Sequence, residues 1–162
     1  MLFRSANSGF TNRSTSGYVI CNINIVVTGG TITGNTTASL VGYLQINSTY
    51  QFEIAGNITF ATTNAFFIYG GVSSGTGGTF KYTSGTVTTT GSSVYFHSIY
   101  LNSGTITWNN VWFLSGLPTT TVLQSDMTVN GLLTLGYLTF AFTINNDGST
   151  RTITAQNGIT MS

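Results

Sequence analysis

Apolar and hydroxyl-bearing residues alternate along most of this chain, in short runs that glycine and asparagine interrupt. The clearest run lies within residues 103–136, where Ile106 and Trp108 alternate with Thr105 and Thr107. The alternation resumes after an Asn-Asn pair and again after the single proline of the chain. A period of two places one set of side chains on each face of an extended strand. The pattern therefore predicts many short strands with one apolar and one polar face.

Further strands and turns are predicted from the same pattern. Strands are predicted at 21–28, 43–47, 49–54, 58–60, 65–69, 80–82, 94–101, 111–114, 127–129, 133–135, 138–145, 153–155 and 159–161. Turns are predicted at Gly29-Gly30, Gly56-Asn57 and Asn146-Asp147-Gly148, and the glycine- and serine-rich residues 70–78 are expected to form a mobile tip. No window has a period of 3.6, so the chain is predicted to be all-β.

A degenerate internal repeat indicates how the strands are arranged. A glycine followed closely by an aliphatic residue and then threonine occurs six times, at Gly30, Gly56, Gly85, Gly104, Gly131 and Gly158. The spacings are 26, 29, 19, 27 and 27 residues. This fits a solenoid whose coils keep their strands and vary their loops. A β-sandwich is the alternative, because strand periodicity does not separate stacked coils from hairpins.

Two segments resemble a known group of solenoids. Gly-Thr-Ile-Thr-Trp-Asn-Asn-Val-Trp-Phe at 104–113 and Leu-Gln-Ser-Asp-Met-Thr-Val-Asn-Gly-Leu-Leu-Thr-Leu-Gly at 123–136 resemble repeats of parallel β-helix proteins. These are phage tail fibres, tailspikes and bacterial surface adhesins. The resemblance covers about residues 20–162. It implies a right-handed parallel β-helix on the exterior of a virion or cell, and it carries over no functional residue.

The amino-acid composition favours some classes of function and argues against others. The 162 residues are 41% hydrophobic but only 4% charged, with a formal net charge of +1. Average soluble proteins carry about a quarter charged residues, so this surface suits a protein that assembles or lies outside the cell. Arg4, Arg13, Lys81 and Arg151 are far apart in sequence, which predicts no nucleic-acid binding. No apolar run approaches the ~20 residues of a membrane span, so no membrane insertion is expected.

The ends of the chain differ from its middle. Residues 1–18 are expected to form an irregular start, and residues 19–162 the solenoid domain. Residues 1–5 translate back to a nucleotide string typical of a sequencing adapter, so we expect them to be an assembly artefact. The chain stops in mid-pattern, so we expect a fragment of a longer protein.

Few residues could carry chemistry, and no catalytic, cofactor-binding or metal-binding residue is predicted. Asp126 and Asp147 lie 21 residues apart and could share one edge, as the carboxyl pair of a retaining glycosidase would. Both stand in turn contexts, however, and Glu53 alternates with strand residues. One histidine, His97, and one cysteine, Cys21, cannot build a zinc site. We expect a structural or exposed His97 and a buried apolar Cys21.

Two sets of side chains suggest binding surfaces. Threonine pairs could stack on a flat face and order water as ice-binding solenoids do: Thr31/Thr33, Thr86/Thr88, Thr105/Thr107 and Thr152/Thr154. The irregular coil spacing argues against a flat lattice. Aromatic residues could stack on sugar rings, although packing in a core or a subunit interface is the preferred prediction: Tyr43, Tyr69, Tyr100 and Trp112.

Residues 65–69 and 111–114 are apolar on both faces, so one face needs a cover beyond the core. The residues expected on that face are Phe67, Tyr69, Trp112 and Leu114. Their cover would be self-association, as a homotrimer in the resembled fibres, or the remainder of a longer chain. We therefore expect a non-enzymatic structural or adhesive segment of an extracellular fibre, first of a phage tail and second of a bacterial surface. A polysaccharide-degrading tailspike enzyme and an ice-binding solenoid are the alternatives, and a cell-surface glycan is a possible partner.

Overall fold

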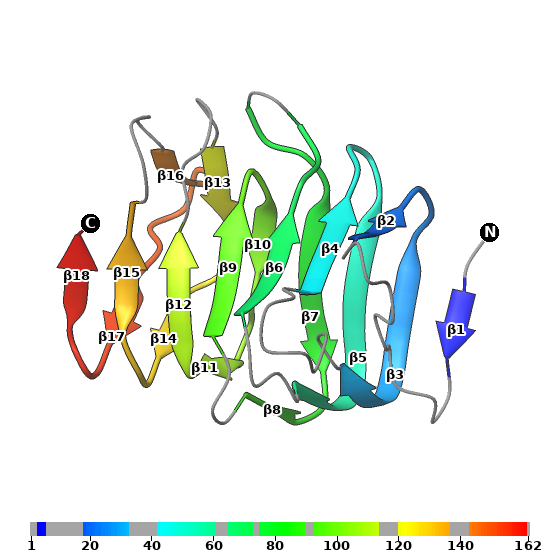
Figure 1. The fold of residues 1–162 in the computed structure, drawn as a ribbon, viewed down its shortest axis with the longest axis horizontal. Helices are drawn as coiled ribbons and strands as arrows, with labels where there is room; N and C mark the ends of the chain where they lie inside the picture. Colours follow the sequence, from blue (N-terminus) through cyan, green and yellow to red (C-terminus); the bar gives the residue numbers. More distant parts are fainter. Residues whose placement is uncertain are drawn as a thin grey trace.

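The computed structural model describes residues 3–5, 18–32, 42–60, 65–72, 75–89, 93–113, 120–136 and 143–161. The strand pairs in these ranges are parallel, and the strands stack in three sheets along one long axis (Figure 1). The same ranges contain no helix. The predicted all-β parallel solenoid is confirmed, and the β-sandwich alternative is wrong because a sandwich requires antiparallel neighbours. The right-handedness that the resemblance implies stays a prediction.

The first sheet follows the order β1-β3-β5-β7-β10-β13-β16, and β8 pairs with β5 beside it. Its strands are β1 (Phe3–Ser5), β3 (Ile25–Ile32), β5 (Gln51–Phe60), β7 (Thr79–Ser84), β8 (Val87–Thr88), β10 (Tyr100–Asn102), β13 (Thr120–Leu123) and β16 (Thr143–Asn146). The second sheet consists of β2 (Tyr18–Cys21), β4 (Gly42–Ile46), β6 (Ala65–Tyr69), β9 (Ser93–His97), β12 (Asn110–Phe113), β15 (Leu133–Leu135) and β18 (Ile159–Met161). The third sheet consists of β11 (Thr107–Trp108), β14 (Met127–Val129) and β17 (Ile153–Ala155).

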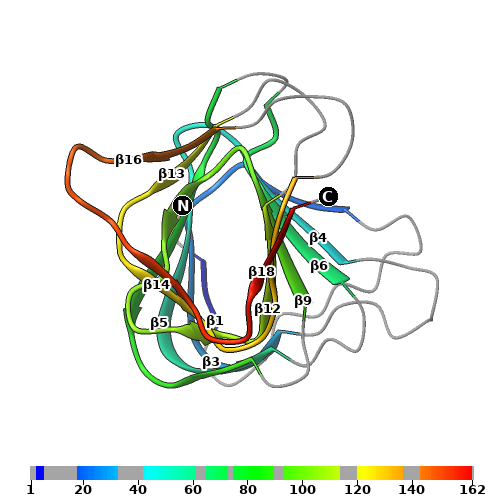
Figure 2. The same cartoon turned by 90° about the vertical axis from the view of Figure 1, so that its left-hand side faces the viewer.

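Each coil crosses the first sheet, then a third face, then the second sheet, as the view along the axis shows (Figure 2). In the C-terminal half three short strands do this in turn, for example β10, β11 and β12. In the N-terminal half β3 and β5 cover both the first sheet and the third face as long strands. They bend at irregularities of register, between Val27 and Gly29 and between Ile54 and Ala55. The predicted turns at Gly29-Gly30 and Gly56-Asn57 are therefore wrong, because these residues lie inside bent strands.

Glycine is needed at this bend because neighbouring coils approach backbone to backbone. A Cβ on Gly56 would overlap the carbonyl oxygen of Thr28, and a Cβ on Gly85 would overlap the backbone of Gly56. The six glycines of the sequence repeat nevertheless occupy two different corners. Gly104 donates its N–H to the hydroxyl of Ser125 at 3.0 Å, whereas Gly131 donates to the carbonyl of Asn109 at 2.7 Å. Gly131 therefore does not repeat Gly104.

Several predicted boundaries are corrected. The predicted strand 21–28 is two strands, β2 and β3, with a bend between them. The predicted strand 94–101 breaks at Ser98, whose φ is +56°. Leu114 and residues 138–142 of predicted strands lie outside the described residues. β1 pairs with β3 inside the stretch 1–18 for which an irregular start was expected, and the division at residue 19 stays a prediction.

The loop at 70–78 is fixed at its base, and residues 73–74 of the expected mobile tip lie outside the described residues. Gly70, Gly77 and Gly78 are buried, and their N–H groups donate to the carbonyls of His97, Ser98 and Ile46. A Cβ on Gly77 would overlap the backbone of Gly70. Glycine is required here because two backbone segments cross too closely for a Cβ atom.

Large apolar side chains from every sheet fill the interior. Trp108 is fully buried and packs against Phe60, Phe80 and Phe96, with ring centroids 5.2–6.0 Å apart. Truncating a buried aromatic residue of this kind to alanine costs about 3–5 kcal/mol. Ile106, Met127 and Val129 are also buried, as their alternation with threonine and asparagine predicts.

Asparagine and aspartate side chains connect consecutive coils at the corners. In each case the Oδ1 atom accepts a hydrogen bond of 2.9–3.0 Å from a backbone N–H 22–29 residues further on, in the next coil. The pairs are Asn24 with Gln51, Asn57 with Thr86, Asn110 with Leu132, and Asp126 with Thr152. These bonds provide acceptors for backbone N–H groups at the corners, where the hydrogen bonding between paired strands is interrupted.

Candidate binding surfaces

The predicted acids are held by structural contacts. Arg151 donates from Nε to Asp147 Oδ1 at 2.9 Å, and its Nη2 also bonds to Asp147. The hydrogen bond from Arg151 lowers the pKa of Asp147, and it raises the pKa of Arg151 in turn. Asp126 adds its charge to the field at Arg151, but its Oδ1 accepts the N–H of Thr152. A general acid of a glycosidase requires a raised carboxyl pKa, so Asp147 does not fit that one role.

The remaining titratable candidates lie apart. Glu53 accepts hydrogen bonds from Gln51 and Thr83 on the outer side of the first sheet. Burial lowers the pKa of His97 and raises the pKa of the Cys21 thiol to about 11. Cys21 is buried, as predicted. Within the described ranges no three histidine, cysteine or carboxylate side chains come together as metal ligands.

Four aromatic rings form a continuous stack on the outer face of the second sheet, which we call the aromatic ladder. It consists of Tyr43 (β4), Phe67 (β6), Tyr95 (β9) and Trp112 (β12). The registers of these strands place the four residues side by side. Successive ring centroids are 4.8, 4.4 and 5.2 Å apart, with interplanar angles of 20–24°.

The ladder confirms the outward parity of Phe67 and Trp112, opposite the buried residues Phe66 and Phe113. Phe67 and Tyr69 are half-buried, so the second apolar face expected at residues 65–69 lies outside the core. Phe67 and Tyr95 each stack on a ring on both faces, whereas Tyr43 and Trp112 at the two ends each stack on one ring. Stacking on a sugar ring needs an open face, so the two inner rings fit a packing role rather than a sugar platform.

The other two aromatic candidates lie off the ladder. Tyr69 donates its hydroxyl to Gln45 Oε1 at 2.6 Å, and Gln45 Nε2 donates to Asn47 Oδ1 at 2.6 Å. Asn47 in turn donates to Asn22, so a chain of polar side chains crosses three coils. Tyr100 belongs to the first sheet and is 37% exposed.

Threonines of the third face stack in register despite the irregular coil spacing. Thr31, Thr59 and Thr88 form one column, and Thr107, Thr128 and Thr154 form another. Thr59, Thr88, Thr107 and Thr154 are exposed. The two columns do not join, since β8 pairs only with β5 and the third sheet begins at β11.

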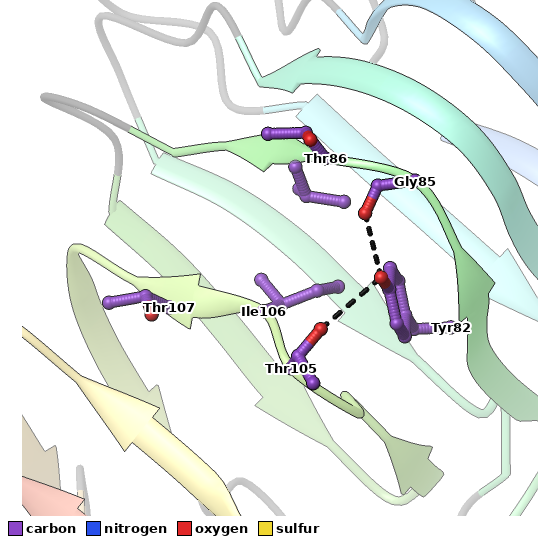
Figure 3. A pocket seen from close by; sticks show the side chains of 7 residues that line it. Tyr82, Gly85, Thr86, Thr105, Ile106 and Thr107 are labelled. Carbon is purple, nitrogen blue, oxygen red and sulfur yellow. Dashed lines mark hydrogen bonds between the residues drawn. The ribbon is translucent and has the colours of Figure 1, made fainter.

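The interruption between β8 and β11 is a groove, which we call the intercoil slot (Figure 3). It contains two adjoining depressions of about 300 Å³ each, both lined by Val87 and Thr107. The first is also lined by Tyr82, Gly85, Thr86, Thr105 and Ile106. Thr88, Trp108 and Asn109 contribute to the second. Two hydrogen-bonded contacts bridge the slot. The Tyr82 hydroxyl donates to the Gly85 carbonyl at 2.7 Å and accepts from Thr105 Oγ1 at 3.2 Å, while Thr89 Oγ1 donates to the Thr107 carbonyl at 2.7 Å.

A change in coil length explains the slot. Phe80 and Val94 pair with Leu101 and Val111 of the next coil, so both flanking sheets are continuous. Between these anchors the chain advances 14 residues in the first coil but only 10 in the second. The coil that contains β8 therefore has four more residues between its anchors than the coil that contains β11, and these two strands do not pair. The sequence carries a signal for this step in the single 19-residue spacing between Gly85 and Gly104.

Comparisons of the sequence with protein-family models and with curated proteins found no match, and neither did a comparison with solved structures. Among the residues that the structure describes, no helix is long and apolar enough to cross a membrane. Because these comparisons identify no family, a function is inferred from the aromatic ladder, the threonine columns and the intercoil slot.

Proposed function

We propose that this chain is a non-enzymatic structural and adhesive segment of an extracellular fibre, first of a phage tail and second of a bacterial surface. The observation that carries the proposal is the uninterrupted parallel register of the second sheet from β2 to β18, with the aromatic ladder stacked along its outer face. In such a stack every coil is held by backbone bonds to its two neighbours. A rod built in this way suits a load-bearing spacer.

Low charge and hydroxyl-rich outer faces support the same proposal. With a formal net charge of +1, copies of the chain repel one another weakly. The half-buried rings of the ladder leave an apolar strip that a further chain would cover. We propose a homotrimer as that cover. Sedimentation velocity of the protein at rising concentration should show a trimer, and a monomer at all concentrations would contradict this and favour the remainder of a longer chain.

The location of the protein tests the fibre proposal directly. Antibodies raised against the chain should label extended structures on the outside of the virions or cells that produce it, in immunogold electron microscopy. Labelling confined to the cell interior would overturn the proposal. Tail and baseplate genes beside the coding sequence would favour the virion, and secretion genes the bacterial surface.

Ice binding is a second candidate, and the two in-register threonine columns favour it. Threonines one rung apart on a parallel ladder lie about 4.7–4.9 Å apart, which presents hydroxyls and methyls at a regular repeat. The intercoil slot separates the two columns, each of which presents three threonines among the described residues. Thermal hysteresis of the purified protein should vanish in a Thr59→Tyr and Thr128→Tyr double variant if ice binding is a function, and its absence in the unmodified protein would exclude it.

A further inference from the structure

We propose that Asn157 is a site of spontaneous deamidation, and that its isoaspartate product releases β18 from β15. The inference concerns the last described coil and does not depend on the fibre proposal. The dipeptide Asn-Gly occurs twice in the sequence, at Asn130-Gly131 and at Asn157-Gly158. The second pair is placed for this reaction, and the first is not.

Deamidation of an Asn-Gly pair begins at the backbone nitrogen of the glycine. This nitrogen attacks Cγ of the asparagine, so that an N–Cγ bond forms, the Cγ–Nδ2 bond breaks, and ammonia leaves with the proton of the glycine amide. Water then opens the succinimide ring at one of its two carbonyl carbons. Opening at one carbon gives aspartate. Opening at the other gives isoaspartate, in which the main chain runs through the side chain and is one carbon atom longer. Glycine permits the ring because it has no Cβ to hinder it.

The two asparagine side chains are both exposed, so the difference between the pairs lies in the glycine amides. Gly131 donates its N–H to the carbonyl of Asn109 at 2.7 Å, and a Cβ on Gly131 would overlap Asn110 Oδ1. Ring closure at Asn130 would have to break this backbone bond and move a glycine that is fixed against the neighbouring coil. The contact between coils therefore protects Asn130 from deamidation.

The amide of Gly158 has no such contact. Gly158 is exposed, its φ is +101°, and apart from its chain neighbours no atom lies within 4 Å of the position of a Cβ. Its N–H has no acceptor within the part of the chain that the structure describes. The side chain of Asn157 donates one exposed hydrogen bond, from Nδ2 to the carbonyl of Asn130. Reaching an attack geometry therefore breaks one exposed side-chain bond and no backbone bond.

The isoaspartate product would lie at the junction between β17 and β18. Just after β17, Gln156 donates its N–H to the carbonyl of Val129. Just before β18, the Gly158 carbonyl accepts the N–H of Leu133, and β18 then pairs with β15. An added main-chain atom between these two anchors displaces Gly158 from Leu133 and shifts β18 along β15. Little packing opposes this shift, because β18 stands at the end of the described order of its sheet and all three of its residues are exposed.

Incubation of the protein in mildly alkaline buffer tests the site. Peptide mapping by mass spectrometry should show deamidation of Asn157 at least about tenfold faster than of Asn130, equivalent to about 1.4 kcal/mol in activation free energy. In urea, where the neighbouring coil no longer holds Gly131, the two pairs should react at similar rates. Asn157→Gln lengthens the side chain by one methylene and should abolish the reaction at this position. Asn130→Gln is the matched control and should leave the reaction at Asn157 unchanged.

Hydrogen exchange tests the release of β18. The product carries an additional negative charge, so ion exchange separates it from the unreacted protein. Isoaspartate at this position should speed amide exchange in β18 and at Leu133, while exchange in β14 and β17 stays unchanged. Asn157→Asp, which adds the charge without lengthening the main chain, is the matched control and should leave β18 as protected as in the unmodified protein.

Several results would overturn the inference. These are no deamidation of Asn157 in the folded protein, equal rates for both pairs in the folded protein, and a preference for Asn157 that persists in urea. Unchanged exchange of β18 in the isoaspartate product, or equally fast exchange in Asn157→Asp, would overturn it as well. Each of these results would leave the fibre proposal to the location and sedimentation experiments.

Discussion

The aromatic ladder makes Phe67 a sensitive test of how this solenoid is stabilised from outside its core. Phe67 stacks on Tyr43 at 4.8 Å and on Tyr95 at 4.4 Å, so truncation removes two ring contacts at once. Each stacked pair contributes about 0.5–1.5 kcal/mol beyond its buried area. Phe67→Ala should therefore lower the free energy of unfolding by about 1–3 kcal/mol, plus a smaller loss from its partial burial. Phe66, the next residue, is fully buried, and Phe66→Ala should cost about 3–5 kcal/mol.

Urea unfolding followed by circular dichroism measures both variants. A double-mutant cycle isolates the stacking: Phe67→Leu and Tyr95→Leu keep apolar volume but remove the paired rings. Their coupling should be about 0.5–1.5 kcal/mol, whereas Tyr43→Leu and Trp112→Leu, two rungs further apart, should add within about 0.5 kcal/mol. Equal coupling in the two cycles would refute the view that direct ring stacking stabilises this face. A Phe67→Ala variant as stable as the unmodified protein would refute it as well.

Three further predictions concern single contacts. Asn57→Ala removes the acceptor of the Thr86 N–H and should destabilise the fold by about 1 kcal/mol in urea, while Asn57→Asp keeps an acceptor and should cost less; equal losses would contradict the corner bond. Because burial raises the pKa of Cys21 to about 11, Ellman's reagent at pH 8 should react with its thiol only after unfolding, and immediate reaction would contradict its burial. Because Arg151 lowers the pKa of Asp147, this carboxylate binds a proton less readily in the folded state than in the unfolded state. The ion pair therefore stabilises the folded protein fully at a pH above the unfolded pKa of the carboxyl group, and this stabilisation is lost as the pH falls through the folded pKa. An NMR titration should place the Asp147 midpoint below its ordinary value, and Arg151→Gln should raise it; an unchanged midpoint would contradict the ion pair.

Alternation predicted the fold class and the inward residues well, because burial on one face of a strand leaves a period of two in any parallel or antiparallel sheet. Ile106 and Trp108 are buried and Thr107 is exposed, as their order in the sequence indicates. Thr107 pairs in parallel with Thr128 of the next coil, as the predicted solenoid requires. The boundaries were predicted less well. Glycines that permit close approach of two backbones look the same in sequence as glycines that turn the chain, and only the position of the neighbouring coil separates the two uses.

The binding surfaces were less accessible to sequence reasoning. Phe67 and Trp112 were assigned to an outer apolar face, but Tyr43 and Tyr95 join them only through registers of 24, 28 and 17 residues. No fixed period relates these positions, so the ladder cannot be read from spacing. The sequence alone, by contrast, indicates that acids are too few to cluster, because the chain has three carboxylate side chains in all.

Variation in coil length is the property that connects the order of this fold to its candidate site. Loops between coils change length without disturbing the ladders, because register is fixed by the apolar face of each strand rather than by the length of the connection. Where the change falls outside a sheet it has no effect on pairing, as the in-register threonine columns show. Where it falls on the third face, between the anchors Phe80 to Val94 and Leu101 to Val111, the neighbouring strands separate and the slot opens. Lengthening the shorter path by four residues after Trp108 should therefore let β11 pair with β8 and close the slot, because Trp108 then lies seven residues from each anchor, as Val87 does. Slower amide hydrogen exchange in β8 and β11 would show the new pairing, while the flanking sheets and the overall fold persist.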